Sequence, residues 1–380
     1  MEVKDRHRFF LNVYFFLSGI CFSTWTSRIP TIKTFFGYND AELGTVLLFM
    51  PISSLVGLPL SGWLVSRFDS RQPMTVSLFF LAIALIFIGW APSTFLLICG
   101  VFLFSFSMRI MNIAVNTQAI TLQKQFDRKI NGTFHGLWST GGIVGVGIST
   151  LFVGLNVSMG IHLSLIAIIT IAAALYSFPF LLQNDRTTAG NKLSMSKPDP
   201  YIVYLGLLVF FAAICEGGMF DWSGVYFKEV VNEDLFTLGY LIFMICMAIS
   251  RFASDSFMER FGMPKTYLIS ASLIFAGIAL AVMFPYFWPS MIGFCLVGLG
   301  TAAVIPMTFL LAGSSKKYSA GVTISIIATY SIVGMLIGPP LIGYVAHAFG
   351  LRIAFVIFGL AGLMLIPISQ FFFRYQKMND

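Results

Sequence analysis

The sequence predicts an all-α membrane protein with twelve transmembrane helices in two six-helix repeats. Three observations lead to this fold class: the composition, a series of long apolar segments and a weak internal repeat. Of the 380 residues, 57% are hydrophobic and 10% are charged, and the mean hydropathy is +0.87. Soluble proteins are about 25% charged. The chain therefore has the composition of a protein embedded in lipid.

Twelve apolar segments, separated by short polar breaks, are each long enough for one helical crossing. A bilayer core about 30 Å thick needs about 20 helical residues. We expect the helices to begin near Phe9, Ala41, Pro73, Thr94, Gly132, Val157, Tyr201, Phe236, Lys265, Trp288, Ser319 and Leu351. The first segment is followed by Arg28 and Pro30 in place of a small-residue cleavage site, so we interpret it as an uncleaved first helix.

The cysteines give no sign of a disulfide or a metal site. All five lie in apolar segments at unrelated spacings, which is typical of small hydrophobic side chains; they are Cys21, Cys99, Cys215, Cys246 and Cys295. We expect no cofactor and no metal.

Lysine and arginine counts in alternate breaks predict the orientation. With the N-terminus in the cytoplasm, that side holds Lys4, Arg6, Arg8, Arg67, Arg71, Lys124, Arg128, Lys129, Arg186, Lys192, Lys197, Arg260, Lys265, Lys316, Lys317, Arg374 and Lys377. The opposite side holds only Arg28, Lys33, Lys228 and Arg352. Both termini are therefore predicted to be cytoplasmic. The net charge of +7 reflects this topology and gives no argument for nucleic-acid binding.

A polar segment divides the chain into two similar halves. Residues 183–200 are predicted to be a cytoplasmic linker between a first half, 1–182, and a second half, 201–380. The segment "SRFDSRQP" from Ser66 resembles "ERFGMPKT" from Glu259, and the same offset places Gly141 on Gly334 and Gly145 on Gly338. Two six-helix halves of like orientation are typical of transporters with parallel repeats, which bind substrate near the midplane between the halves.

The two loop segments resemble a known signature. "GWLVSRFDSRQ" (62–72) and "RFASDSFMERFGMPK" (251–265) resemble the cytoplasmic loop signature of the major facilitator superfamily, and the resemblance covers essentially the whole chain. Within that superfamily, "TWTSRIP", "NGTFHGLWSTGG" and "CEGGMFDWSGVYF" look like a group of bacterial inner-membrane proteins called YbjJ-like. The resemblance implies solute transport without naming a substrate.

In that family, an aspartate at the end of the second helix and basic residues of the loop form a charge relay that holds the cytoplasmic side closed. Gly62, Arg67 and Arg71 match this pattern. Ser66 stands where the aspartate is expected and Asp69 replaces a glycine, so the resemblance leaves the first-half latch in doubt.

The second half keeps more of the signature. Asp255 and Arg260 match it, and Arg251 lies one helical turn before Asp255, within side-chain reach. We therefore expect the conformational latch there. The alternative is that these charges only mark the membrane edge.

Two acidic residues, Glu216 and Asp221, lie deep in the seventh apolar segment. Ionisable groups inside a membrane are expensive and by default mark a solute or proton path. The acids are about 140° apart on an ideal helix. Gly217 and Gly218 lie between them and are expected to bend the helix. The alternative is that one acid only pairs with a neighbouring helix.

The fourth segment carries a polar stripe that must face the protein interior. Its members are Ser105, Arg109, Asn112 and Asn116. Arg109 offers a planar charged group to a carboxylate, either of the substrate or of Glu216. The alternative is an internal network that only holds the first half together.

The fifth segment adds two residues to the predicted site. His135 and Trp138 share one face of this segment, and His135 is the one histidine expected to titrate inside the bundle. The alternative is a histidine bonded to a backbone carbonyl.

The end of the first helix completes the predicted site. Arg28 ends this helix and is expected to pair with Asp221, flanked by Trp25 and Trp222. An interfacial aromatic belt is the alternative for the tryptophans.

These observations predict a transporter of the bacterial cytoplasmic membrane and not an enzyme. We expect a monomer that moves a small polar or amphipathic organic solute by alternating access, coupled to protons. A proton-driven drug exporter and a receptor on a transporter scaffold remain as alternatives. Substrate, direction, coupling ion and oligomeric state do not follow from the residues.

Overall fold

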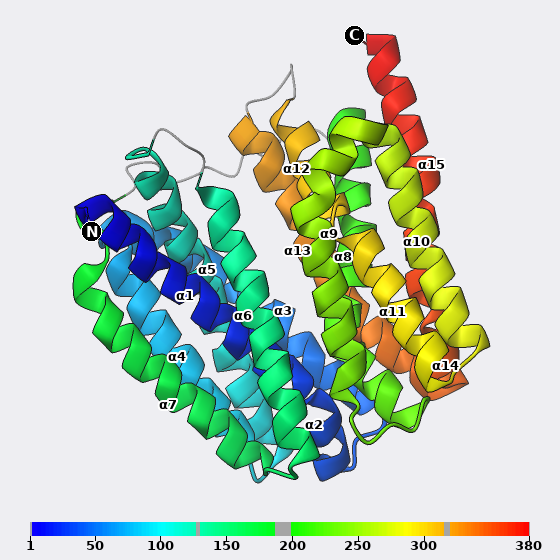
Figure 1. Cartoon of the computed structure of the whole chain (residues 1–380), viewed down its shortest axis with the longest axis horizontal. Helices are drawn as coiled ribbons and strands as arrows, with labels where there is room; N and C mark the ends of the chain where they lie inside the picture. Colours follow the sequence, from blue (N-terminus) through cyan, green and yellow to red (C-terminus); the bar gives the residue numbers. More distant parts are fainter. Residues whose placement is uncertain (1, 127–129, 187–198, 315–319, 380) are drawn as a thin grey trace. The chain divides into compact units, whose positions relative to one another are not determined.

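The computed structural model describes residues 2–126, 130–186, 199–314 and 320–379, and their regular structure is helical (Figure 1). The elements are α1 (Val3–Ser27), α2 (Ile29–Phe36), α3 (Asp40–Arg67), α4 (Arg71–Gly89), α5 (Thr94–Gln123), α6 (Asn131–Gly154), α7 (Met159–Ser177), the 3-10 turn η1 (Phe178–Phe180), α8 (Pro200–Glu229), α9 (Thr237–Phe261), α10 (Met263–Met283), α11 (Phe287–Thr301), α12 (Val304–Gly313), α13 (Ala320–Phe349), α14 (Leu351–Ala354) and α15 (Val356–Asn379).

These helices supply twelve candidate membrane spans, which confirms the predicted number. Eleven begin within two residues of the predicted starts. The first begins at Val3, six residues before Phe9, because the charged residues that precede the apolar segment continue the helix.

Prolines explain the helix breaks within the first and the tenth spans, Val3–Phe36 and Phe287–Gly313. Pro30 lacks the N–H that would bond the carbonyl of Thr26, and α1 gives way to α2 at Arg28. Pro306 has the same effect on the carbonyl of Ala302, and the chain turns at Ala302 and Ala303 between α11 and α12. The break at Arg28 lets this residue leave the axis of the first helix.

The chain divides into two compact units. Unit 1 comprises Met1–Phe36 and Phe49–Asn191, and unit 2 comprises Gly37–Leu48 and Lys192–Asp380. The beginning of α3 thus belongs to unit 2, where a Cβ on Gly44 would lie 3.1 Å from the Cα of Gly343. Most of the predicted linker, residues 183–200, lies outside the described residues.

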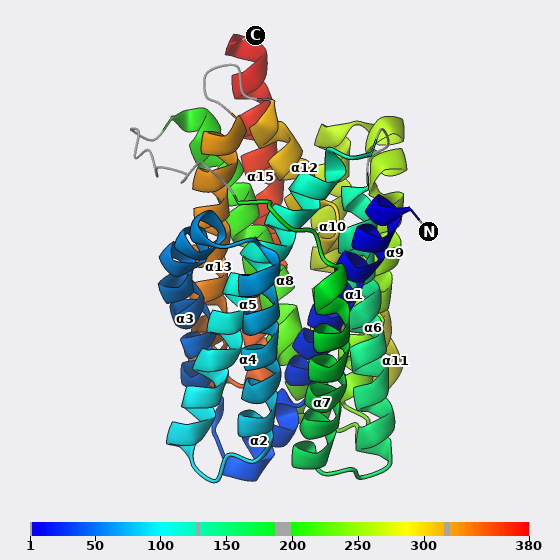
Figure 2. The ribbon, with the colours of Figure 1, turned by 90° about the vertical axis from the view of Figure 1, so that its left-hand side faces the viewer.

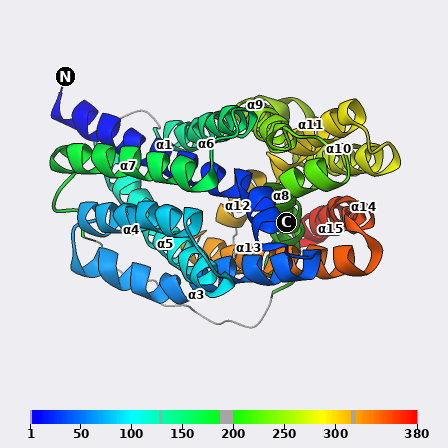
Figure 3. The same cartoon turned by 90° about the horizontal axis from the view of Figure 1, so that it is seen from below.

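The same helix pairings occur within each unit. In unit 1, α1 packs on α6 and α7, while α4 packs on α5 and α7 (Figure 2). In unit 2, α8 packs on α13 and α15, while α10 packs on α11 and α15, and α9 lies beside α11 (Figure 3). Each unit therefore builds its core from equivalent helices of the sequence repeat.

Glycines bring the main helix pair of each unit into backbone contact. A Cβ on Gly141 of α6 would overlap the carbonyl oxygen of Phe16 on α1, and one on Gly145 would lie 2.8 Å from that of Ile20. In unit 2, a Cβ on Gly334 of α13 would lie 2.6 Å from the carbonyl oxygen of Phe210 on α8. These glycines thus allow close helix packing, which is the role small residues play in membranes.

We predict that Gly141→Ala destabilises the protein by about 1–3 kcal/mol, because the added methyl group forces α1 and α6 apart. Gly147→Ala is the matched control, because it lies on the same helix with no atom within 4 Å of the added Cβ. Thermal unfolding in detergent would show a lower midpoint for Gly141→Ala alone. Equal midpoints for the two variants would contradict the packing role.

Candidate functional site

Glu216 and Asp221 both lie on α8. Asp199 caps α8 by accepting a hydrogen bond from the N–H of Tyr201, and Pro200 occupies the first turn, both favourable starts for a helix. The helix is continuous through Gly217 and Gly218, over Pro200–Glu229, and the bend expected there stays a prediction. Gly218 makes room for the ring of Phe358 on α15, which a Cβ there would overlap.

Glu216 forms an ion pair with Arg251 of α9. The Arg251 Nη2 donates to Glu216 Oε1 at 2.6 Å, and the Glu216 residue is only 6% exposed. The other carboxylate oxygen, Oε2, is buried and has no hydrogen-bond partner among the described residues. Arg251 was predicted to belong to the latch with Asp255. In the structure it reaches the centre of the predicted site, whereas the side chain of Asp255 lies outside the described part.

Asp221 is a buried carboxylate of a different kind. It is 9% exposed, and within the described residues it has neither a hydrogen-bond nor an ion-pair partner. The Trp222 Nε1 and Ser223 Oγ beside it are also buried without a partner in that part of the chain. Trp222 has no exposed surface, so the interfacial-belt alternative is wrong for it. This part of α8 therefore offers donors and an acceptor that have no partner in the described part of the chain.

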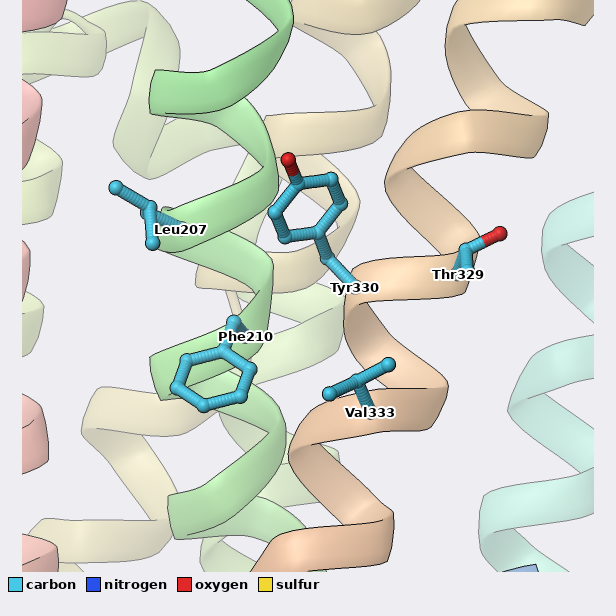
Figure 4. Close-up of a pocket in the computed structure, with 5 residues that line it drawn as sticks. All are labelled: Leu207, Phe210, Thr329, Tyr330 and Val333. Carbon is cyan, nitrogen blue, oxygen red and sulfur yellow. The ribbon is translucent and has the colours of Figure 1, made fainter. Parts of the chain in front are cut away.

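An apolar cavity of about 350 Å³ lies nearer the start of α8 than the two acids (Figure 4). Leu207 and Phe210 of α8 line it with Thr329, Tyr330 and Val333 of α13. The Tyr330 ring packs over Gly206, where a Cβ would lie 2.8 Å from the ring. Sequence periodicity gave no indication of this cavity, because aromatic residues are frequent throughout the chain.

In unit 1, the polar stripe of α5 is partly occupied by contacts with α3. Arg109 Nε donates to Ser54 Oγ at 2.6 Å, and Ser105 Oγ donates to the carbonyl of Met50 at 2.7 Å. Asn116 Nδ2 donates to the backbone and side-chain oxygens of Asn112, at 2.7 and 3.2 Å. Asn112 itself is exposed on the unit.

Arg28 finds its partners inside unit 1. Its Nε donates to His162 Nδ1 at 3.0 Å, and its Nη2 donates to the carbonyl of Val157 at 3.0 Å. Arg28 is 4% exposed and His162 is fully buried. The expectation that Arg28 pairs with Asp221 is therefore replaced by a contact that ties the end of α1 to α7. A lone histidine in an apolar helix was the sequence signal for this contact.

The aromatic residues of the predicted site differ in burial. Trp25 is 1% exposed and packs against Phe104 with ring centroids 6.0 Å apart, so it is a core residue and the belt alternative is wrong. Trp138 packs on Phe22 at 5.8 Å. His135 is exposed on unit 1, with an edge contact to the Phe15 ring at 5.6 Å. The prediction that His135 is the interior histidine is wrong, since His162 is the buried one.

Comparisons with known proteins decide the family. The model of the Major Facilitator Superfamily matches residues 2–150 and 241–378. The chain belongs to the major facilitator superfamily. Its relatives include membrane protein MosC of Rhizobium meliloti, 30% identical over 96% of this chain and 89% of the relative. An uncharacterized MFS-type transporter of Yersinia pestis is 30% identical over 93% of this chain and 92% of the relative.

Solved structures share the fold. The nucleoside transporter NupG, as a mutant, aligns with a TM-score of 0.81 at 14% identity, covering 98% of this chain and 100% of that one. A bacterial homologue of the human lysosomal transporter Spinster aligns with a TM-score of 0.77 at 15% identity, covering 98% of both chains. Membership in this transporter superfamily, which is not an enzyme class, agrees with the predicted fold. Membership of the YbjJ-like group stays a prediction.

In this superfamily member, the α3–α4 loop is held by a buried hydrogen-bond cluster. Ser70 donates to Asp185 through its N–H, at 2.8 Å, and through its hydroxyl. Gln118 Nε2 of α5 donates to the same hydroxyl at 2.8 Å and to the carbonyl of Leu182 at 3.3 Å. Ser70 and Gln118 have no exposed surface. Sequence reasoning missed this cluster, although Gln118 is a lone polar residue on an apolar face.

Asp69 strengthens the same connection. It accepts from Arg186 Nε at 3.1 Å. Burial raises the pKa of the Asp69 carboxyl, but a backbone hydrogen bond from Asn184 and the Arg186 guanidinium lower it more, so this pKa lies below its ordinary value. The aspartate that replaces the signature glycine thus binds the segment that follows α7.

The other signature residues lie at the surface or on aromatic rings. Ser66 is exposed and donates to the carbonyl of Trp63 in its own helix. Arg71 lies over the Phe178 ring at 5.1 Å, and Arg260 over the Phe261 ring at 5.5 Å. Gly62 and Arg67 are exposed. Their role as a latch stays a proposal.

We predict that Asp69→Asn lowers the free energy of unfolding at pH 7 by about 0.5–1 kcal/mol and so lowers the unfolding midpoint. The effect is small because the Arg186 partner is largely exposed. A carboxylate with a lowered pKa stabilises the fold above the ordinary aspartate pKa of about 3.9, and this stabilisation is lost as the pH falls through the lowered value. The unfolding midpoints of wild type and Asp69→Asn should therefore become equal at acid pH. A constant difference down to acid pH would contradict the ionic origin.

We predict that Arg251→Met destabilises the protein by about 2–3 kcal/mol, less than for a fully buried pair because 28% of the Arg251 side chain is exposed. The same change should cost less in a Glu216→Gln background, since the uncompensated carboxylate is then absent. Arg260→Met, at an exposed position of the same helix, is the control. Additive effects of Arg251→Met and Glu216→Gln would show that the pair is not coupled.

Proposed function

We propose that the protein is a secondary active transporter that moves a small polar or amphipathic organic solute by alternating access, coupled to protons. The family supports a membrane transporter that binds small molecules. The halves 1–182 and 201–380, joined by the linker 183–200, are proposed as the two parts that move. The excess of lysine and arginine on one side supports a bacterial cytoplasmic membrane location with both termini inside.

The Glu216–Arg251 ion pair carries this proposal. A charge pair in a membrane-spanning bundle is costly, and such residues mark solute or proton paths by default. Glu216 Oε2 is buried and has no partner among the described residues, so this oxygen can take up a proton without losing a hydrogen bond. We propose that protonation of Glu216 breaks the pair and frees the Arg251 guanidinium to bind an acceptor group of the solute. Loss of the proton restores the pair and releases the solute.

The surroundings of the pair support a solute with mixed character. Asp221, Trp222 and Ser223 provide an acceptor and donors that lack partners in the described chain, which suits hydroxyl or amine groups. The cavity lined by Phe210 and Tyr330 suits an apolar or ring-shaped part. In unit 1, the exposed Asn112 and the Arg109 guanidinium add further groups for a polar solute.

The test is proton exchange on addition of solute to the purified protein in liposomes. A panel of sugars, nucleosides, amines and zwitterions would be compared between wild type, Glu216→Gln and Asp221→Asn. We expect a solute that causes proton exchange in wild type and Asp221→Asn but not in Glu216→Gln. Exchange that disappears only in Asp221→Asn would move the proton site to Asp221.

The same experiment distinguishes transport from proton coupling and from a receptor role. A solute that crosses the membrane without any proton exchange in wild type would contradict coupling and leave transport in place. Binding without transport would favour the receptor alternative. We propose that the protein is a monomer, and size-exclusion chromatography with light scattering of the detergent-solubilised protein tests this.

A further inference from the structure

Two cysteine thiols meet between α9 and α11 in unit 2. The Cys246 Sγ donates to the Cys295 Sγ across a distance of 2.8 Å. A disulfide has an S–S distance of about 2.05 Å. Because the two residues are 49 positions apart in sequence, their spacing gave no sign of this contact.

The packing of the two helices fixes the thiols face to face. A Cβ on Gly298, one turn beyond Cys295, would lie 3.2 Å from the Cβ of Cys246 and 2.5 Å from the carbonyl oxygen of Phe243. One turn beyond Cys246, Ser250 Oγ donates to the carbonyl of Leu299 at 2.8 Å. The helices are thus held in one register on the neighbouring turn. The two Sγ atoms therefore need to approach by less than 1 Å to reach the disulfide bond length of about 2.05 Å.

The other cysteines are placed differently. Cys21 contacts Thr170 Oγ1 at 3.3 Å and Cys215 donates to the carbonyl of Phe358 at 3.3 Å. Cys99 is exposed. Among the described residues, only Cys246 and Cys295 therefore have a thiol as partner.

Metal binding fits this geometry poorly. Thiolates bind zinc at about 2.3 Å, so two thiolates on one tetrahedral ion lie about 3.8 Å apart. The sulfur atoms are already closer than that. Among the described residues, no group of three potential ligands gathers around a common point. Disulfide formation would shorten the Sγ–Sγ distance from 2.8 Å, whereas zinc binding would lengthen it and move α9 away from α11.

We propose that Cys246 and Cys295 are a modification site that forms a reversible disulfide with two-electron oxidants soluble in the bilayer, such as quinones. Both S–H bonds break, one S–S bond forms, and the two electrons and two protons pass to the oxidant, which becomes the quinol. Cys246 lies about 14 Å along α9 from its first residue, near the middle of the span, where polar oxidants do not reach. The disulfide joins α9 to α11 five residues before Arg251 and restricts the movement of that arginine.

The experiment counts thiols with a maleimide–polyethylene glycol reagent in denatured protein, before and after diamide treatment of the native protein in liposomes. Diamide enters membranes and takes up two electrons and two protons. We expect wild type to fall from five labels to three. Cys246→Ser and Cys295→Ser should each keep four labels, while Cys99→Ser, the matched control, should fall from four to two.

Further readouts separate this site from other thiol chemistry. The oxidised chain should run as a monomer in non-reducing gels, and dithiothreitol should restore all five labels. The oxidised wild type should unfold at a higher temperature, and oxidised Cys295→Ser should not. Five labels in wild type after diamide, or a loss of two labels in Cys246→Ser, would overturn the proposal.

Discussion

The bilayer offers backbone polar groups no partner, and this constraint determines most of the structure. Every peptide group within the hydrocarbon core must be satisfied inside its own helix, so the chain forms helices wherever it crosses. Association of the helices then cannot depend on excluding water. It depends on close contact, which is why Gly141 and Gly334 let backbones touch in the main helix pair of each unit. For the same reason, a polar side chain between the helices costs free energy unless another protein group pairs with it.

Polar side chains inside the units differ in charge as well as in partners. Arg28 with His162 and Gln118 with Ser70 hold the fold, although His162 Nε2 and Gln118 Oε1 are themselves buried without a partner among the described residues. Buried polar atoms of this kind occur in both units and do not by themselves mark a site. A buried carboxylate costs more than a buried neutral group. Glu216, with one paired oxygen, and Asp221, with no partner among the described residues, are therefore the groups that we propose for function.

The sequence was sufficient for the number of spans and for most of their starts, because hydropathy depends on local composition. Partners between helices were harder to predict. The arginine partner of Glu216 was sought on α5 and found on α9, because spacing along one helix does not say which neighbour it faces. His162 and the Cys246–Cys295 contact were missed for the same reason. In the signature loop, Asp69 departs from the family pattern, and its contact with Arg186 shows what the substituted residue does.

The central claim is that the Glu216–Arg251 pair couples a proton to solute movement, and a test should separate coupling from transport. The variant Glu216→Gln removes the titrating carboxylate and keeps the Arg251 guanidinium that is proposed to bind the solute. The measurement is accumulation of a labelled solute in liposomes with and without an imposed pH gradient. The account predicts that Glu216→Gln still exchanges solute but no longer accumulates it when the gradient is present. Accumulation at the wild-type level would contradict it.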